Sequence, residues 1–185
     1  MGILGDSLDK AEANTVTRPA PKSAPAQMRF LVKQEKGSTR TVAALLGVSQ
    51  RTVERYLKGQ LKHPRKDLAA RLAAEVRRRW QPRVRERAKK RAADTGGIII
   101  ETRARFGFTA APGTTDDSRI RLITQALPPA YAARLFDARA TGASEQQLRD
   151  IAAEGLQEIY FKDRGRRADG LLVEFTDIDY VELDF

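Results

Sequence analysis

The residues of this sequence best suited to chemistry form a short polar cluster after a Pro-Gly turn. Within TAAPGTTDDS, residues 109–118, two hydroxyls precede two carboxylates: Thr114, Thr115, Asp116 and Asp117. A hydroxyl on an exposed loop can enter another protein's active site and attack phosphorus there. Adjacent carboxylates could hold Mg²⁺ beside a substrate phosphate. Loop threonines without a role and acidic residues that form a turn are the alternative interpretations.

Composition excludes most other catalytic chemistry. His63 is the only histidine and there is no cysteine, which removes Ser-His-Asp and Cys-His catalysis, disulfides and thiolate metal sites. Neither a Walker A motif nor G-x-G-x-x-G occurs. We therefore expect no cofactor or metal of the protein's own, and a cytoplasmic location. No apolar run approaches the roughly 20 residues of a membrane span, so no membrane partner is expected.

A second set of polar side chains has the types that read DNA bases. Gln and Arg can make paired hydrogen bonds to adenine and guanine edges in the major groove. These types recur at the outward positions of a helix predicted to begin at Gln50, which are Gln50, Arg51, Glu54, Arg55 and Lys58. A three-helix packing unit without a ligand would use the same apolar pattern and would not need these side chains.

The elements that would position this set form a predicted helix-turn-helix over residues 38–60, STRTVAALLGVSQRTVERYLKGQ. Gly47 can reverse the chain at positive φ, and Ser49 is a good N-cap for the second helix. Apolar side chains recur on the inner faces of both helices, at Val42, Ala43, Leu45, Leu46, Val53 and Leu57. The pattern predicts DNA binding.

A third set is a basic run near the end of a predicted basic helix over residues 65–91. It comprises Arg77, Arg78, Arg79, Arg83, Arg85, Arg87, Lys89, Lys90 and Arg91. Phosphate contacts are the favoured interpretation, and a solvated surface is the alternative. Pro82 lacks an N–H and predicts a kink or a break near Gln81. Trp80 is expected to pack at this hinge rather than to stack on bases.

Charge is divided unequally along the chain. The net charge is +10, and residues 1–97 hold 23 basic and 9 acidic residues, whereas residues 98–185 hold 11 and 15. Because a basic surface favours a polyanionic partner, the N-terminal half is the predicted nucleic-acid face.

We predict an α+β protein with three parts. Residues 1–24, rich in Ala, Pro, Ser and Thr, should form a flexible arm, with a short helix around Leu4–Ala13 at most. Residues 25–94 should form the helical DNA-binding domain. Residues 98–185 should form a small α+β domain, since the hydrophobic period changes there from 3.6 to 2.

The α+β part should begin with a hairpin, whose strands over 98–108 and 119–127 flank the polar cluster. Two helices should follow, one from Pro128-Pro129 and one with a capping box at Ser144. In the tail the alternation slips near Asp177 and Val181, which predicts a strand, a bend and an edge strand. That C-terminal edge could mediate self-association or could only close the sheet.

Taken whole, the chain resembles the telomere-protecting terminal proteins of linear actinomycete (Streptomyces-type) replicons. The resemblance covers nearly the full length and rests on the strings STRTVAALLGVSQRTVERYLKG, WQPRVRERAKKRA, GGIIIETRARFGFTAAPGTTDDSRIR and LITQALPPAYAARLFDARA. It implies that the chain becomes covalently linked to telomeric 5′ ends. It also implies that Thr114 carries the hydroxyl that primes end-patching DNA synthesis, with Thr115 as the runner-up.

The same resemblance implies partners. A DNA polymerase would supply Mg²⁺ and the deoxynucleotide, and a telomere-associated protein would recruit the chain to the 3′ overhang of telomeric DNA. The protein would then be a primer rather than an enzyme, with self-catalysed nucleotidylation as an open alternative. Without the resemblance, a helix-turn-helix transcription regulator with a C-terminal dimerisation or effector domain would lead. A DNA-joining enzyme is a third idea, for which the sequence offers no acid–base support.

Overall fold

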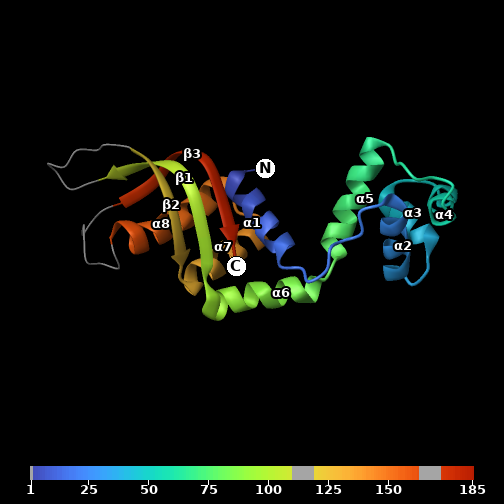
Figure 1. The fold of residues 1–185 in the computed structure, drawn as a ribbon, viewed down its shortest axis with the longest axis horizontal. Helices are drawn as coiled ribbons and strands as arrows, with labels where there is room; N and C mark the ends of the chain where they lie inside the picture. Colours follow the sequence, from blue (N-terminus) through green and yellow to red (C-terminus); the bar gives the residue numbers. More distant parts are fainter. Residues whose placement is uncertain (1, 110–118, 163–171) are drawn as a thin grey trace. The chain divides into compact units, whose positions relative to one another are not determined.

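The computed structural model of this chain describes residues 2–109, 119–162 and 172–185. Within these residues it contains eight α-helices, two π-helical segments and one three-stranded sheet, which confirms the predicted α+β class. The chain divides into two compact units. Unit 2 is helical and spans Thr17–Pro82, whereas unit 1 combines the residues up to Val16 with Arg83–Phe185 and holds the sheet (Figure 1).

Unit 2 is a cluster of four helices around one apolar core. Its helices are α2 (Ala24–Gln34), α3 (Thr39–Leu46), α4 (Gln50–Leu57) and α5 (Lys66–Arg79). Each helix buries an apolar stripe against the others, and the side chains with no exposed surface are Met28, Leu31, Val42, Leu46, Val53 and Leu72. The core thus joins the predicted pair of short helices to the helices on either side of it.

The predicted basic helix over residues 65–91 is two helices. α5 ends at Arg79, Gln81 takes a positive φ of 46°, and α6 (Pro82–Arg91) begins at the proline. The break near Gln81 is therefore confirmed, and its cause is the missing N–H and the ring of Pro82. The units also divide here, at Pro82, rather than at the expected boundary after residue 94.

Unit 1 is built on an antiparallel sheet with the strand order β2-β1-β3. The central strand β1 (Ile98–Thr109) pairs with β2 (Arg119–Leu127) on one side and with β3 (Leu172–Asp184) on the other. Alternate residues of β1 point into the core, as the period of two predicts: Ile98, Ile100, Thr102, Ala104 and Phe106.

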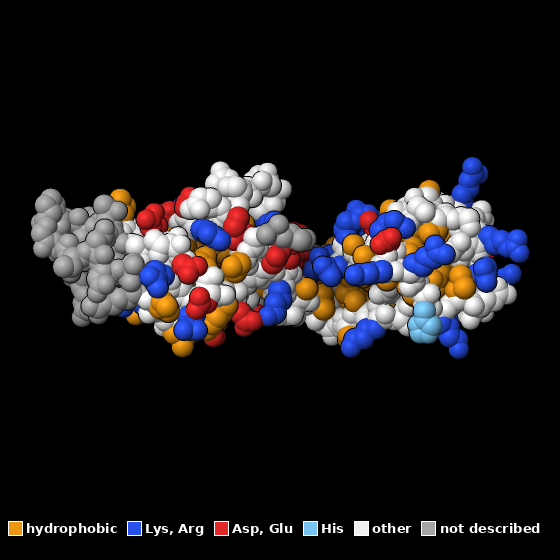
Figure 2. Space-filling model, turned by 90° about the horizontal axis from the view of Figure 1, so that it is seen from above, with side chains coloured by type: hydrophobic (Ala, Val, Ile, Leu, Met, Phe, Trp, Pro, Cys, Tyr) orange, Lys and Arg blue, Asp and Glu red, His pale blue; other side chains and the backbone are white. Residues whose placement is uncertain are grey.

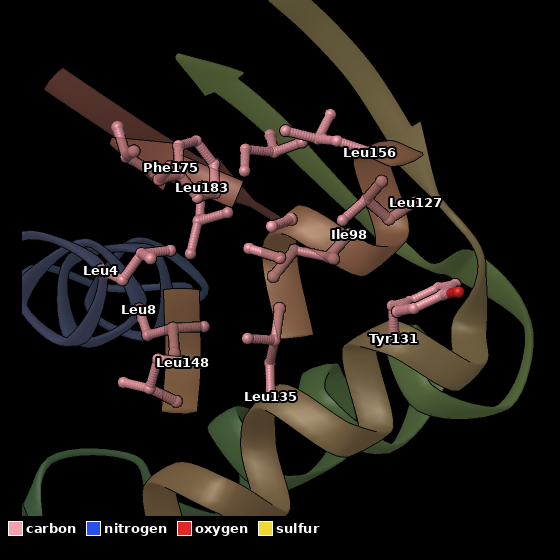
Figure 3. Packing of buried hydrophobic residues seen from close by; sticks show 14 of the residues in the cluster. Leu4, Leu8, Ile98, Leu127, Tyr131, Leu135, Leu148, Leu156, Phe175 and Leu183 are labelled. Atoms are coloured by element: carbon pink, nitrogen blue, oxygen red, sulfur yellow. The ribbon is translucent and has the colours of Figure 1, made fainter. Parts of the chain in front are cut away.

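Helices cover the apolar face of this sheet. Leu135 of α7 (Pro129–Ala140) and Leu148 of α8 (Glu145–Leu156) pack with Leu127 and Ile98 in one core (Figure 3). The capping box predicted at Ser144 is confirmed. Two π-helical segments, η1 (Ala92–Gly96) and η2 (Gln157–Phe161), continue α6 and α8.

The N-terminal segment differs from the flexible arm expected over residues 1–24, whereas the short helix expected around Leu4–Ala13 is confirmed. Residues Ile3–Asn14 form helix α1, which packs in unit 1 and buries Leu4, Leu8 and Ala11 (Figures 1 and 3). The Glu145 carboxylate caps the helix by accepting the N–H groups of Leu4 and Gly5 at 2.7 and 3.2 Å. Apolar residues at i, i+4 and i+7 supply enough buried surface to order a segment whose overall composition is polar.

The C-terminal tail is a single strand rather than a strand, a bend and an edge strand. β3 absorbs the two phase slips as irregularities opposite Arg103/Ala104 and Arg105/Phe106. Its outer edge is met by α1, because the N–H of Leu183 donates to the Ser7 hydroxyl at 2.9 Å. Self-association through this edge stays a prediction, and a partner strand would have to displace that contact near Leu183.

In the parts of the chain that the structure describes, no helix is both long and apolar enough to cross a membrane.

Candidate nucleic-acid interface

Helices α3 and α4 meet through a turn whose local chemistry follows the sequence. The Ser38 hydroxyl accepts the N–H of Thr41 at 3.1 Å and caps α3. Gly47 ends α3 in the left-handed conformation, with φ 60° and ψ 41°. The Ser49 hydroxyl then accepts the N–H of Thr52 at 3.2 Å and starts α4. The predicted turn glycine and N-cap are both confirmed.

The inner face of α4 differs slightly from the prediction. Val53 is fully buried as expected, but Tyr56 is also buried, whereas Leu57 is half-buried at the edge of the core. This leaves Gln50, Arg51, Arg55 and Lys58 exposed and Glu54 half-buried. The structure therefore places four of the five predicted base-reading residues on α4, a helix of about two turns, and the fifth, Lys58, at its C-cap.

Two of these side chains are held in place by hydrogen bonds. The Gln50 amide donates to the Thr39 hydroxyl of α3 and to the Glu54 carboxylate, at 3.0 Å in each case. Arg51 and Arg55 make no ion pair within Thr17–Pro82, every residue of which the structure describes. The surface of α4 thus combines two fixed acceptor groups, the Gln50 side-chain oxygen and the Glu54 carboxylate, with the guanidinium groups of Arg51 and Arg55, which form no ion pair within the unit.

Unit 2 carries the net positive charge of the chain. Thr17–Pro82 holds 16 Lys and Arg residues against 4 Asp and Glu residues. The face of this unit seen in Figure 2 accordingly shows many Lys and Arg side chains and few Asp and Glu side chains. Such a surface attracts a polyanion through counterion release, with little dependence on sequence.

The basic run over residues 77–91 does not act as one surface. Arg79 donates to the Glu35 carboxylate and also pairs with Glu75 at 3.2 Å, and only 22% of its side chain is exposed. The hydrogen bond that Arg79 donates to the Glu35 carboxylate raises the pKa of Arg79 above its ordinary value. Arg79 is therefore a structural link between α2 and α5, whereas the neighbouring Arg77 is exposed.

The cations of α6 divide in the same way. Arg85 donates to Glu12 of α1 at 3.1 Å, and Lys89 lies 3.9 Å from the other oxygen of that carboxylate. Both side chains are largely covered, and they tie α6 to α1 within unit 1. Arg83, Arg87, Lys90 and Arg91 are exposed, and Lys90 pairs with Asp94 at 2.7 Å.

Trp80 packs at the hinge, as expected. Its ring lies edge-on to Phe30, with the centroids 5.1 Å apart, and its indole N–H donates to the carbonyl of Arg18 at 2.9 Å. Gln81 binds the adjacent backbone, because its side-chain oxygen accepts the N–H of Thr17 at 2.9 Å. The indole thus fastens the two ends of unit 2 to each other.

The candidate priming residues lie outside the described residues. β1 and β2 are paired from Ile98–Leu127 to Phe106–Arg119, so the predicted hairpin is present up to its connection. Thr114, Thr115, Asp116 and Asp117 all fall in that connection, residues 110–118. Among the residues that are described, no group of three or more His, Cys, Asp or Glu side chains could hold a metal ion.

Sequence reasoning missed the acidic partners of the predicted DNA-binding cations. Glu75 lies three and four residues before Arg78 and Arg79, a spacing that indicates pairing along a helix. Glu35 and Glu12 lie 44 and 73 residues away from Arg79 and Arg85, and no local signal points to them.

Comparison of the chain with protein-family models, with curated proteins and with solved structures finds no match.

Proposed function

We propose that this chain is a DNA-binding terminal protein, which becomes covalently attached to the 5′ ends of telomeric DNA in linear replicons of the bacterial cytoplasm. Two observations support the proposal beside the resemblance of the sequence. The positive charge is concentrated on a helical unit that displays base-reading side chains, and the string PGTTDDS occupies the connection of a β-hairpin. The hairpin is the observation that carries the proposal, because it makes a hydroxyl-bearing connection between two paired strands.

The proposed chemistry assigns the reacting hydroxyl to Thr114. Its oxygen attacks the α-phosphate of a deoxynucleotide in the Mg²⁺-containing site of a DNA polymerase, forming a phosphoester as pyrophosphate leaves. The hydroxyl proton is lost to the polymerase site or to water. The new nucleotide then offers the 3′-hydroxyl from which the polymerase continues, while unit 2 holds the DNA.

Mass spectrometry of the protein recovered with its native DNA tests this proposal. After nuclease and trypsin digestion, the peptide Phe106–Arg119 should carry a nucleotide monophosphate on Thr114. A Thr114→Ala variant should lose covalent attachment while it keeps its far-UV circular dichroism and its DNA affinity. Thr115→Ala is the matched control and should remain attached. An unmodified peptide in good yield, with no adduct elsewhere, would refute the terminal-protein function.

The proposed partners follow from this chemistry. The 3′ overhang of telomeric DNA, a telomere-associated recruiting protein and a DNA polymerase would meet on the chain. Co-purification of the polymerase should depend on the α+β unit, because the hairpin must enter its active site. Self-association through the edge of β3 is a further part of the proposal and would require α1 to yield near Leu183.

A transcription regulator is the second candidate function. It is favoured by the α3–α4 arrangement, in which a capped helix presents Arg51 and Arg55, neither of which forms an ion pair within Thr17–Pro82. A regulator should protect a duplex promoter sequence, should lose that protection when both arginines are replaced by alanine, and should carry no nucleotide. A terminal protein should instead be recovered covalently linked to DNA ends.

A further inference from the structure

The amide group of Gln50 cannot donate to a base in the observed arrangement. An amide nitrogen has two hydrogens, and both are engaged, one by the Thr39 hydroxyl and one by the Glu54 carboxylate. Paired recognition of adenine by Gln requires one of these donors. What this end of α4 still offers to a ligand is the Gln50 oxygen and the remaining lone pairs of Glu54, all of them acceptors.

A carboxylate at a DNA interface needs a donor to offset its repulsion by phosphate. In the major groove the donor that Glu and Asp characteristically accept from is the N4 amino group of cytosine. Guanine, on the opposite strand of the same base pair, presents two acceptors to Arg. Glu54 therefore complements cytosine, and the exposed Arg51 and Arg55 complement guanine.

The aromatic residues of unit 2 bear on the kind of DNA that it binds. Single-stranded nucleic acid is commonly held by stacking bases on exposed aromatic rings. Unit 2 has three aromatic residues: Tyr56 is buried, and Phe30 and Trp80 pack against each other. All residues of Thr17–Pro82 are described, so this unit offers no exposed Phe, Tyr or Trp ring as a stacking platform.

We propose that unit 2 reads duplex DNA and that Glu54, held by the Gln50 amide, selects a C·G base pair. This inference rests on the proposed DNA-binding function and specifies its ligand. The Gln50 amide donates both to the Thr39 hydroxyl and to the Glu54 carboxylate, so the carboxylate is fixed before DNA arrives, which lowers the entropy lost on binding.

Selection from a pool of random duplex DNA, with the full chain as the bait, tests the inference. The wild-type protein should enrich duplexes with a fixed C·G pair, and substitution of that pair should weaken binding by about tenfold. Glu54→Gln should change the preferred base from C to A, because Gln can pair with adenine through one acceptor and one donor. Glu54→Ala should lose the preference at that position alone.

Asp67→Asn is the matched control, because it removes the same charge from an exposed position of α5 in the same unit. It should leave the selected sequence unchanged. Selection of the same C·G pair by Glu54→Gln, absence of any base preference in the wild type, or tighter binding of single strands than of duplex would each overturn the inference. All three outcomes include DNA binding and leave the proposed function intact. Failure of the full chain to bind any DNA would overturn both.

Discussion

Arg77 and Arg79 lie two residues apart on α5, and we expect Arg79 to stabilise the fold and Arg77 to contact DNA. Arg79→Ala leaves the half-buried Glu35 without its ion-pair partner and leaves Glu75 with Arg78 alone, which should lower the free energy of unfolding of unit 2 by about 1–2 kcal/mol. Arg77→Ala should change it by less than about 0.5 kcal/mol. Urea unfolding followed by the fluorescence of Trp80, the single tryptophan, measures both.

The two arginines should exchange roles when DNA binding is measured. If Arg77 contacts a phosphate, its replacement by alanine should reduce the slope of log affinity against log salt by about 0.9. Arg79→Ala should leave that slope unchanged, because its guanidinium is already neutralised within the protein. An equal loss of slope in both variants would contradict this division between contact and scaffold.

Glu75 should make the stability of unit 2 depend on pH. Its hydrogen bond from Arg78, together with the charges of Arg78 and Arg79, lowers its pKa below the ordinary value of 4.5. A carboxylate whose pKa is lowered by folding contributes stability above its unfolded pKa and loses it as the pH falls through the folded pKa. Unit 2 should therefore lose stability below about pH 4.5, and Glu75→Gln should flatten that part of the profile in chemical denaturation.

Individual side chains were predictable where their partners are close in sequence. The caps at Ser38 and Ser49 and the positive φ at Gly47 follow from residues within one turn of the helix. The engagement of Arg79 and Arg85 could not be predicted, because it depends on carboxylates brought near by tertiary packing. A basic run in a sequence therefore overstates the number of cations that are free to bind phosphate.

At the scale of elements, α1 shows how buried contacts override composition. Its Leu8 packs into the core of unit 1, whereas Ile3 at the start of the same helix is 38% exposed. Leu8→Ala should destabilise unit 1 by about 2–5 kcal/mol, and Ile3→Ala should cost far less. Hydrogen exchange of the β1 and β3 amides measures this difference directly. A flexible arm would instead make the two substitutions equally silent.

The three strands differ in how well hydrophobic alternation in the sequence predicts them. β1 was predictable because its buried side chains keep a period of two from Ile98 to Phe106, and the observed bounds of β1 and β2 agree with the predicted strands. The C-terminal tail was harder to predict, since the alternation of buried and exposed side chains along β3 is interrupted twice. In the sequence, an interruption of the alternation predicts a bend. In the structure, β3 stays paired with β1 across both irregularities, because each register shift keeps the apolar side chains on the covered face of the sheet.

At the scale of the whole chain, unit 2 is an insertion between α1 and the rest of unit 1. The two ends of the insertion are held together, since Thr17 bonds to Gln81 and the indole of Trp80 bonds to Arg18. A sequence read in order assigns α1 to a flexible arm and α6 to the DNA-binding domain, because the basic charge runs on through α6. Only the contacts of Leu4, Leu8 and Glu12 return these segments to unit 1.

This organisation predicts that unit 2 folds alone and that unit 1 does not fold without α1. A fragment of residues 17–82 keeps its whole core and the bonds that join its ends, so it should unfold cooperatively. It should also bind DNA with a strong salt dependence, because it holds 16 of the 34 basic residues and only 4 of the 24 acidic ones. Circular dichroism and a salt titration of DNA binding check both statements.

The complementary fragment, residues 83–185, should be unstable because removal of α1 uncovers the apolar face beside β3 and leaves Arg85 without Glu12. Addition of a peptide of residues 1–16 should restore the protection of the β3 amides from hydrogen exchange. Ser7→Ala in that peptide should reduce the restored protection near Leu183, whose N–H would lose its acceptor. A stable 83–185 fragment would show instead that α1 is an accessory to the sheet.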